Sequence, residues 1–142
     1  MGIIKAVSIS KEKGIKKTNV DEVQLKENFG IIGDAHAGSS RQVSLLACES
    51  IQKMKDKGLK VGSGDFAENI TTEGIDLLSL KVGDKLKAGT EAILEISQIG
   101  KVCHTRCNIY YQAGDCVMPK EGIFARVLKG GVIKTGDEII IG

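Results

Sequence analysis

The sequence predicts a mostly β fold, a single β-barrel with one or a few short helices. Eighteen glycines against one proline are spread over 142 residues, a pattern typical of short elements joined by tight turns. Short runs of branched apolar residues recur between these turns, whereas helical spacing is clear in one segment only. Many short strands with few helices favour closure of the sheet into a barrel.

The expected strands are rich in branched apolar residues and bounded by turn formers. Apolar and polar side chains alternate most clearly in residues 92–98, which predicts a strand with one face toward a core. Val82-Gly83-Asp84 and Thr135-Gly136-Asp137 each precede an expected strand and suit turns with a positive φ at glycine. The expected strands cover residues 3–10, 21–25, 42–46, 85–88, 92–99, 122–128 and 138–141.

One amphipathic helix is expected at residues 47–57. Ile51 and Met54 recur there at helical spacing among Lys and Glu, and Gly58 is a natural terminator. No linker-like or low-complexity stretch divides the chain, and its length is close to that of one domain. We therefore expect a single domain over residues 1–142.

The composition argues against several classes of protein. The formal net charge is +2, and aromatic residues make up 4% with no Trp, which argues against a nucleic-acid partner. No export signal and no run of about 18 apolar residues is present, so we expect a cytoplasmic protein with no membrane partner. A basic segment is expected to be a solvated loop. It contains Lys11, Lys13, Lys16 and Lys17.

The four cysteines are expected as thiols, metal ligands or sulfur carriers rather than as disulfides. Cys103 is the preferred reactive thiol because cationic or titratable residues surround it, and such a setting favours the thiolate that attacks sulfur or binds a soft metal. The alternative is a buried apolar cysteine, which is the role expected of Cys48 on the predicted helix. The neighbours of Cys103 are Lys101, His104 and Arg106.

A zinc site is a second interpretation of the same segment, because Zn²⁺ favours tetrahedral thiolate and imidazole ligands. Structural zinc sites usually leave two residues between paired cysteines, whereas three separate Cys103 from Cys107 and no second pair follows. The spacing therefore favours a reactive thiol. The candidate zinc ligands are Cys103, Cys107, Cys116 and either His104 or His36.

The glycine-rich segment 30–42 could bind an anion. Backbone N–H groups of such a loop can hold an anion, and Arg41 would add a guanidinium fork. The alternative is a structured turn in which Asp34 bonds to its own backbone and His36 is structural. The spacing leaves both interpretations open.

Segment 62–74 is a third polar stretch. Asn69, Thr71 and Thr72 either hydrogen-bond a polar heterocycle or close turns within the loop. The local sequence does not separate these two interpretations.

Taken in order, these segments resemble the MOSC family, named for the C-terminal domain of molybdenum cofactor sulfurases. The resemblance spans almost the whole chain and rests on the ordered set rather than on any one piece. It implies a β-barrel-like fold with few helices. It is carried by Gly-Asp-Ala-His-Ala-Gly at 33–38, Arg-Gln-Val-Ser-Leu-Leu at 41–46, Asp-Phe-Ala-Glu-Asn-Ile at 65–70, Leu-Lys-Val-Gly-Asp at 80–84, the strand and loop at 94–103, Gly-Ile-Phe-Ala-Arg-Val at 122–127 and the glycine turns at 130–137.

The resemblance implies a role for Cys103, which follows a strand of the form Leu-Glu-Ile-Ser-Gln. In sulfurases the family's cysteine is thought to handle persulfide sulfur, and in amidoxime-reducing relatives it coordinates molybdenum; both roles need a thiolate. Cys107 and Cys116 depart from the simplest family pattern and resemble small bacterial members. Two roles stay open for them: resolving a persulfide on Cys103 as a disulfide, or sharing metal ligation.

The resemblance also implies that the chain binds molybdenum cofactor (molybdopterin) or a precursor, with Cys103 carrying persulfide sulfur or ligating molybdenum. Two other functions stay open: a non-catalytic carrier or partner module in cofactor biosynthesis, and a structural zinc protein. The residues expected around the cofactor are Asp34, His36, Arg41, Asn69, Thr71, Lys101, Arg106 and Arg126.

The sequence has no pyridoxal-phosphate lysine motif and no flavin or nicotinamide fingerprint, so we expect no internal source of sulfur or electrons. A partner is expected to supply them, either a sulfur donor or an electron-transfer protein, among proteins of molybdenum-cofactor biosynthesis or molybdoenzymes. The chain is then either a molybdenum-dependent or sulfur-transfer enzyme that needs this partner, or a carrier.

Overall fold

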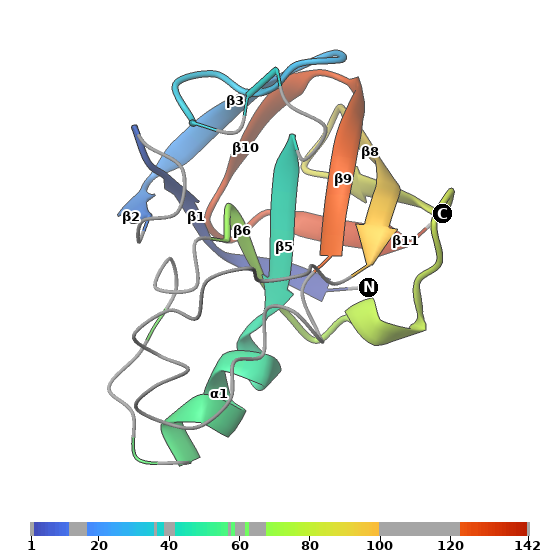
Figure 1. The fold of residues 1–142 in the computed structure, drawn as a ribbon. Coiled ribbons are helices and arrows are strands. Elements are labelled where there is room, and N and C mark those ends of the chain that lie inside the picture. The colour runs from blue at the N-terminus through green and yellow to red at the C-terminus, as the bar shows by residue number, and fades with distance from the viewer. Residues whose placement is uncertain are drawn as a thin grey trace.

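The computed structural model describes residues 2–11, 17–35, 37–38, 42–56, 58, 62, 68–99 and 123–141. In these residues the fold is mostly β, which confirms the predicted fold class. Figure 1 shows the strands gathered into one body, with the helix α1 (Cys48–Asp56) at one end. No helix in the described ranges is long and apolar enough to cross a membrane.

Every strand expected from the sequence is present, with ends shifted by a residue at most. β2, β4, β6 and β10 were not predicted. β2 and β4 have three and two residues, which is too short for an alternating pattern to stand out, whereas β6 and β10 were missed although they are as long as β7 and β11. The elements besides α1 are β1 (Gly2–Ile9), β2 (Thr18–Val20), β3 (Glu22–Lys26), β4 (Gly30–Ile31), β5 (Val43–Ala47), β6 (Ile70–Glu73), the 3₁₀ helix η1 (Leu77–Ser79), β7 (Lys85–Ala88), β8 (Ala92–Ile99), β9 (Ile123–Lys129), β10 (Gly131–Lys134) and β11 (Glu138–Ile141).

The larger sheet closes into a barrel in the order β11-β7-β8-β9-β5-β6-β1. Closure comes from β1, whose Gly2 lies opposite Ile139 of β11. The other end of β1 pairs with β2, with Val7 opposite Val20. Closure pairs the backbone groups that an open sheet edge would expose.

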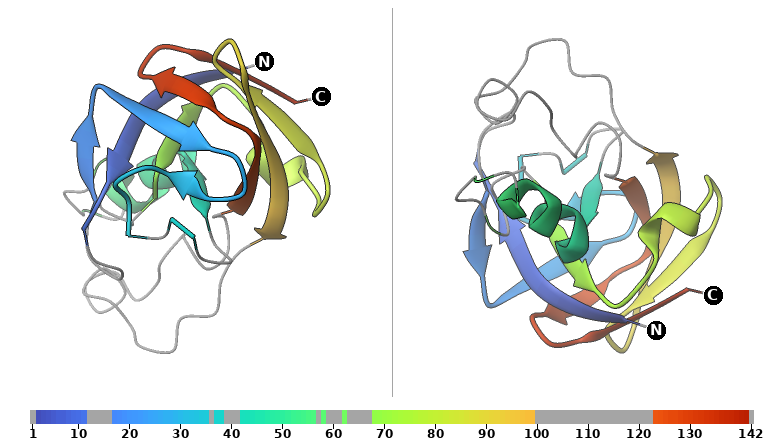
Figure 2. Two further views of the ribbon diagram at one scale, coloured as in Figure 1. Left: turned by 90° about the horizontal axis from the view of Figure 1, so that it is seen from above. Right: turned by 90° about the horizontal axis from the view of Figure 1, so that it is seen from below.

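The barrel interior is filled by branched aliphatic side chains. In β8, Leu94 and Ile96 are buried, whereas Ile93 and Glu95, which alternate with them, are partly exposed, as the alternation in the sequence predicts. The smaller sheet, in the order β10-β3-β4, contributes Leu25 to the same buried cluster. Figure 2 shows this sheet over one end of the barrel and α1 at the opposite end.

Helix α1 is part of a crossover. β5 and β6 are parallel, with Leu45 opposite Ile70, so the chain must return from the end of one strand to the beginning of the other. α1 follows β5 directly and buries Ile51 and Met54, as predicted. Gly58 has a φ of 92° beyond the helix end, and its N–H donates to the carbonyl of Lys55 at 2.9 Å.

The two Gly-Asp turns have the conformation that the sequence predicts. Gly83 has a φ of 97° and Gly136 a φ of 95°. The carboxylate of Asp84 accepts a hydrogen bond from the N–H of Lys81 at 2.8 Å. The carboxylate of Asp137 accepts the corresponding bond from the N–H of Lys134 at 3.0 Å. Each Asp thus closes the turn that leads into β7 or β11.

Candidate functional site

The predicted site residues divide into two sets. Seven lie outside the described residues: His36, Arg41, Lys101, Cys103, Arg106, Cys107 and Cys116. Four are described: Asp34, Asn69, Thr71 and Arg126. The strands still show where the undescribed segments join the barrel.

The segment that carries Cys103 joins the barrel at one point of its rim. β8 ends at Ile99 and β9 begins at Ile123, and these two residues are paired. The two described residues that flank segment 100–122 therefore lie side by side.

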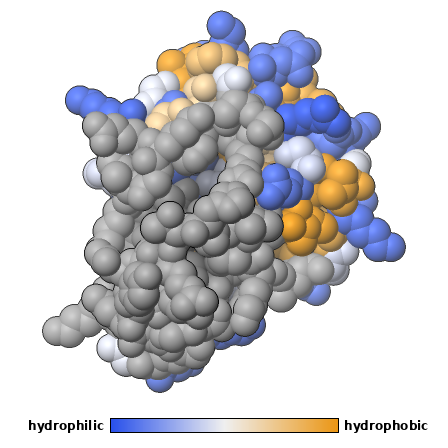
Figure 3. Space-filling model, viewed as in Figure 1, coloured by the Kyte–Doolittle hydropathy of each residue, from blue (hydrophilic) through white to orange (hydrophobic). Residues whose placement is uncertain are grey.

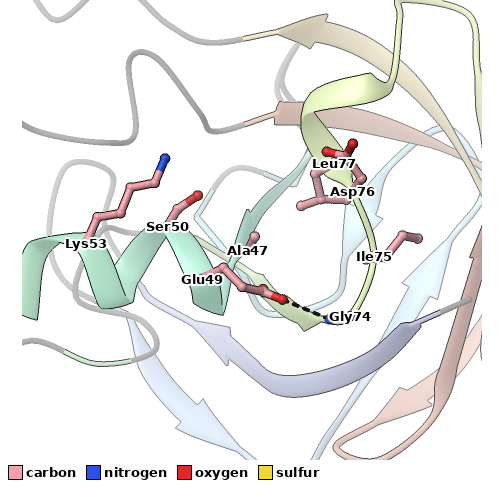
Figure 4. A pocket seen from close by; sticks show the side chains of 8 residues that line it. All are labelled: Ala47, Glu49, Ser50, Lys53, Gly74, Ile75, Asp76 and Leu77. Carbon is pink, nitrogen blue, oxygen red and sulfur yellow. Dashed lines mark hydrogen bonds between the residues drawn. The ribbon is translucent and has the colours of Figure 1, made fainter.

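A surface cavity of about 320 Å³ lies at the same end of the barrel. Leu45 pairs with Ile123, so Ala47 at the end of β5 lies just beyond the beginning of β9, and Ala47 lines the cavity. Figure 4 shows Lys53 of α1 on one side of it and Asp76 on the other. The volume is at the lower end of the range for small-molecule sites.

The surface near the same rim is partly apolar. Ile99 is 46% exposed although it belongs to β8. Figure 3 shows apolar surface on the side of the barrel formed by β8 and β11.

The loop that carries Arg41 joins the opposite end of β5. Gln42 precedes β5, and its Oε1 accepts a hydrogen bond from the N–H of Val127 at 3.1 Å, past the Val43–Ala125 pair. Arg41 is therefore attached away from the end at which Ile123 lies. The points of attachment of the Arg41 loop and of the Cys103 segment thus lie toward opposite ends of β5.

Asp34 forms a buried ion pair with Lys17. Lys17 Nζ lies 2.7 Å from Asp34 Oδ1, and both side chains are 0% exposed. Asp34 Oδ1 also accepts from the N–H of Ser10 at 3.1 Å, and Lys17 Nζ donates to Ser10 Oγ at 3.1 Å. The expectation that Lys17 lies in a solvated loop is wrong, because a carboxylate distant in sequence offsets the desolvation of its ammonium group.

Asn69 joins three strands. Its Oδ1 accepts from the N–H and the Oγ of Ser44 on β5 at 3.0 and 3.1 Å. Its Nδ2 donates to the carbonyl of Ser8 on β1 at 3.1 Å, and the residue directly precedes β6. Thr71 is also buried, and its Oγ1 donates to Glu68 Oε2 at 3.1 Å. The partners of Asn69 favour a role in joining strands, whereas the bond of Thr71 is local, and contact with a cofactor stays a prediction for both residues.

Arg126 lies on the outer face of the barrel. Its side chain is 54% exposed, and its Nε donates to Glu95 Oε1 at 2.6 Å across the β8–β9 pair. An exposed ion pair of this kind adds little stability. The role of Arg126 toward a cofactor also stays a prediction.

The described residues contain no group of three His, Cys, Asp or Glu side chains that could hold a metal ion.

The MOSC domain model matches residues 33–140. This chain belongs to the MOSC family. No curated protein matches it.

Three solved structures share the fold over 97–100% of this chain. The YuaD protein from Bacillus subtilis aligns with a TM-score of 0.81 at 20% identity, covering 97% of this chain and 93% of its own. YiiM from Geobacillus stearothermophilus aligns with a TM-score of 0.74 at 23% identity, covering 100% and 75%. YiiM from Escherichia coli aligns with a TM-score of 0.68 at 19% identity, covering 99% and 70%.

Cys48 of this MOSC domain is not a core residue, and that prediction is wrong. The side chain is half-buried, and its Sγ lies 3.5 Å from Glu49 Oε1 and 3.6 Å from Glu73 Oε2. Burial, together with these two carboxylates, raises the pKa of the Cys48 thiol to about 11. Because the thiolate is the reactive form, Cys48 is a poor nucleophile at neutral pH.

We expect Cys48 to react with iodoacetamide about a hundredfold more slowly at pH 8 in the folded domain than in the unfolded chain, because the raised pKa lowers the thiolate fraction. The rate should still rise as the pH approaches 11. Mass spectrometry of the Cys48 peptide measures it. Glu73→Gln should speed the reaction, and an equal rate in folded and unfolded chain would contradict the assigned environment.

Thr72 carries a buried hydroxyl that has no hydrogen-bond partner within the described part of the chain. A buried unsatisfied hydroxyl costs about 1–3 kcal/mol, so Thr72→Val should raise the free energy of unfolding by about 1–2 kcal/mol. Thr71→Val is the matched control with the opposite sign, since Thr71 Oγ1 is bonded to Glu68. Urea unfolding of both variants tests this; a loss of stability in Thr72→Val would contradict it.

Lys17, Ser10 and Ser44 were not predicted from the sequence as parts of the polar network. A signal existed for Ser44, because a Ser inside the apolar run Val-Ser-Leu-Leu needs a hydrogen-bond partner once that run forms a buried strand. Lys17 gave no such signal, because its partner Asp34 lies beyond three intervening strands in sequence.

Proposed function

We propose that this MOSC domain binds molybdenum cofactor, or a precursor of it, and that Cys103 carries persulfide sulfur or ligates molybdenum. The observation that most supports the proposal is the pairing of Ile99 with Ile123. It attaches both ends of the Cys103 segment beside a cavity that α1 lines. Family membership and the cationic neighbours of Cys103 in sequence agree with it.

The four described members of the predicted cofactor set all have partners within the chain. Asp34, Asn69 and Thr71 are buried and bonded within the chain, and the guanidinium of Arg126 pairs with Glu95. We therefore assign cofactor contact to the remaining members. These are Lys101, Cys103 and Arg106 in one segment and His36 and Arg41 in the other.

The sulfur chemistry of this chain requires a donor that holds a persulfide. The Cys103 thiolate attacks the terminal sulfur of that persulfide, a new S–S bond forms on Cys103, and the donor sulfur leaves as a thiolate. Attack of Cys107 on Cys103 Sγ would then release hydrosulfide and leave a disulfide. Molybdenum cofactor, when bound, supplies redox chemistry that amino-acid side chains do not.

A partner protein is part of the proposal. The persulfide is an oxidised form of sulfur that the partner must already carry, because transfer to Cys103 changes no overall oxidation state. In the molybdenum-ligating role, the partner would supply electrons instead.

Native mass spectrometry with elemental analysis tests the proposal on protein purified anaerobically from a molybdate-supplied host. We expect a pterin-sized adduct with molybdenum, or one added sulfur, in wild type and its loss in Cys103→Ser. Cys48→Ser is the matched control, because the raised pKa of its thiol makes this cysteine unreactive, and it should load as wild type does. Stoichiometric zinc in both variants without either adduct would replace the proposal with a structural zinc site.

A further inference from the structure

We propose that this domain forms a two-fold symmetric dimer through the outer face of β11, β7, β8 and β9, so that a second copy of the chain covers this face. The face carries a basic row of residues beside an acidic edge, a pattern that is complementary to itself. The inference goes beyond the proposed function and does not depend on it. The surface, called here the dimer face, consists of Lys87, Glu91, Ile93, Lys129, Glu138 and Ile140.

The basic row crosses four neighbouring strands of the barrel. Lys87 of β7 pairs with Ile140 of β11 on one side and with Ile93 of β8 on the other. Ile93 in turn pairs with Lys129 of β9. Directly opposite residues share one face of a sheet, so cationic and branched aliphatic side chains alternate along the row. Both lysines are exposed and Ile140 is 38% exposed, so the row lies on the outside of the barrel.

The acidic edge lies beside this row, at one end of β7. Ala88, the last residue of β7, pairs with Ile139 of β11 and with Ala92 of β8. Glu138 directly precedes Ile139, and Glu91 directly precedes Ala92. Both glutamates are exposed. The acidic edge is therefore displaced from the basic row by about 7 Å along the strands.

The lysines of the basic row keep their charge for a partner. The ion pairs within the described part of the chain involve neither Lys87 nor Lys129. Farther along the same strands, Arg126 is offset by Glu95, whose Oε1 accepts a hydrogen bond from Arg126 Nε at 2.6 Å. Figure 3 shows apolar and hydrophilic surface intermixed on the side of β8 and β11, as this alternation requires.

The two opposite charges on the dimer face favour a second copy over another kind of partner. An acidic protein or a nucleic acid would meet the acidic edge with like charge, and a basic partner would meet the basic row with like charge. A two-fold axis that lies in the interface, between the row and the edge, sets the basic row of one protomer against the acidic edge of the other, and does so twice. Ile93 and Ile140 then lose contact with water in the same step.

The size of the dimer face predicts a weak dimer. Four strands about 4.8 Å apart, with about four residues along each strand, give a surface of roughly 19 by 14 Å. Stable interfaces bury about 800 Å² on each partner, which is more than this face offers. We therefore expect a dimer Kd of about 10–100 μM that rises with ionic strength.

Sedimentation equilibrium in reducing buffer tests the proposal, at protein concentrations from about 5 μM to about 1 mM. The acidic variant, Lys87→Glu/Lys129→Glu, makes both the row and the edge acidic. The basic variant, Glu91→Lys/Glu138→Lys, makes both of them basic. Circular dichroism checks that each variant is folded. The matched control makes the same change in net charge as the acidic variant, at exposed residues outside the dimer face, and is Lys11→Glu/Lys55→Glu.

We expect wild type and the control to dimerise alike, and the dimer Kd of the acidic and the basic variant, each alone, to rise at least about tenfold. An equimolar mixture of the two variants should dimerise at least as tightly as wild type, because each row then meets opposite charge. Ile140→Ser, which keeps every charge, should also raise the Kd and replaces a charge variant that fails to fold.

Three outcomes would overturn the proposal. The first is wild type that stays monomeric at the highest concentration. The second is a dimer whose Kd changes no more in the variants than in the control, because the chain would then associate through another surface. The third is a mixture of the acidic and basic variants that associates no better than either variant alone, because opposite charges would then not be what joins the two copies.

Discussion

Replacement of Lys17 by Met alone is expected to lower the free energy of unfolding by about 3–5 kcal/mol. The substitution keeps the size and shape of the side chain but removes the ammonium group that lies 2.7 Å from Asp34 Oδ1. The Asp34 carboxylate is then buried without its counter-charge. A buried charge without its partner destabilises the fold more than the removal of both charges does.

Urea unfolding of the single and double variants measures this effect. Lys17→Met/Asp34→Asn should recover most of the loss, because neither remaining side chain carries a charge. Lys5→Met, at an exposed ion pair, is the control and should change stability little. A loss in Lys17→Met no larger than that in Lys5→Met would show that the buried pair is not coupled as its geometry indicates.

Asn69→Ala is expected to lower the free energy of unfolding by about 3 kcal/mol. The substitution removes the acceptor of two Ser44 donors and the donor to the Ser8 carbonyl. All three groups lie in residues that are almost fully buried, so water cannot replace the lost bonds without opening the strands.

Thermal and urea unfolding of Asn69→Ala test this structural role. Asn19→Ala is the matched control, because Asn19 is exposed and accepts a single hydrogen bond from Ser8 Oγ at 2.6 Å. If Asn69→Ala kept its stability and lost only cofactor loading, the original prediction that Asn69 binds the cofactor would be the better one.

The barrel strands could be predicted because the sequence features that specify them, alternation and turns, are local. β7 and β8 alternate apolar and polar residues and are bounded by glycine turns, so the pattern and the turns agree. β4 and β6 were not predictable in this way. Their pairing depends on strands formed elsewhere, as in the parallel contact of Ile70 with Leu45. β4 has only two residues, and β6 does not alternate, because Ile70, Thr71 and Thr72 are all buried.

The site was predictable only as a set of residue types. Asp34 and Asn69 were selected from polar segments, but their partners lie far along the chain: Ser8 is 61 residues from Asn69, and Lys17 is 17 residues from Asp34. The prediction that Cys48 is a core residue was wrong for the same reason, because its neighbour Glu73 belongs to the distant strand β6. Contacts of this range are set by the closed barrel and leave no spacing in the sequence.

The way the barrel closes has a consequence for how such a unit can be built into larger proteins. Gly2 pairs with Ile139, so the beginning of the first strand and the last strand lie beside each other, and Figure 1 shows both chain ends on one side of the body. A unit whose ends meet can be inserted into a surface loop of a host, or have its ends joined and a new break opened elsewhere, without pulling its strands apart. Its architecture is thus compatible with shuffling as a cassette, in which the same barrel is carried between different polypeptides.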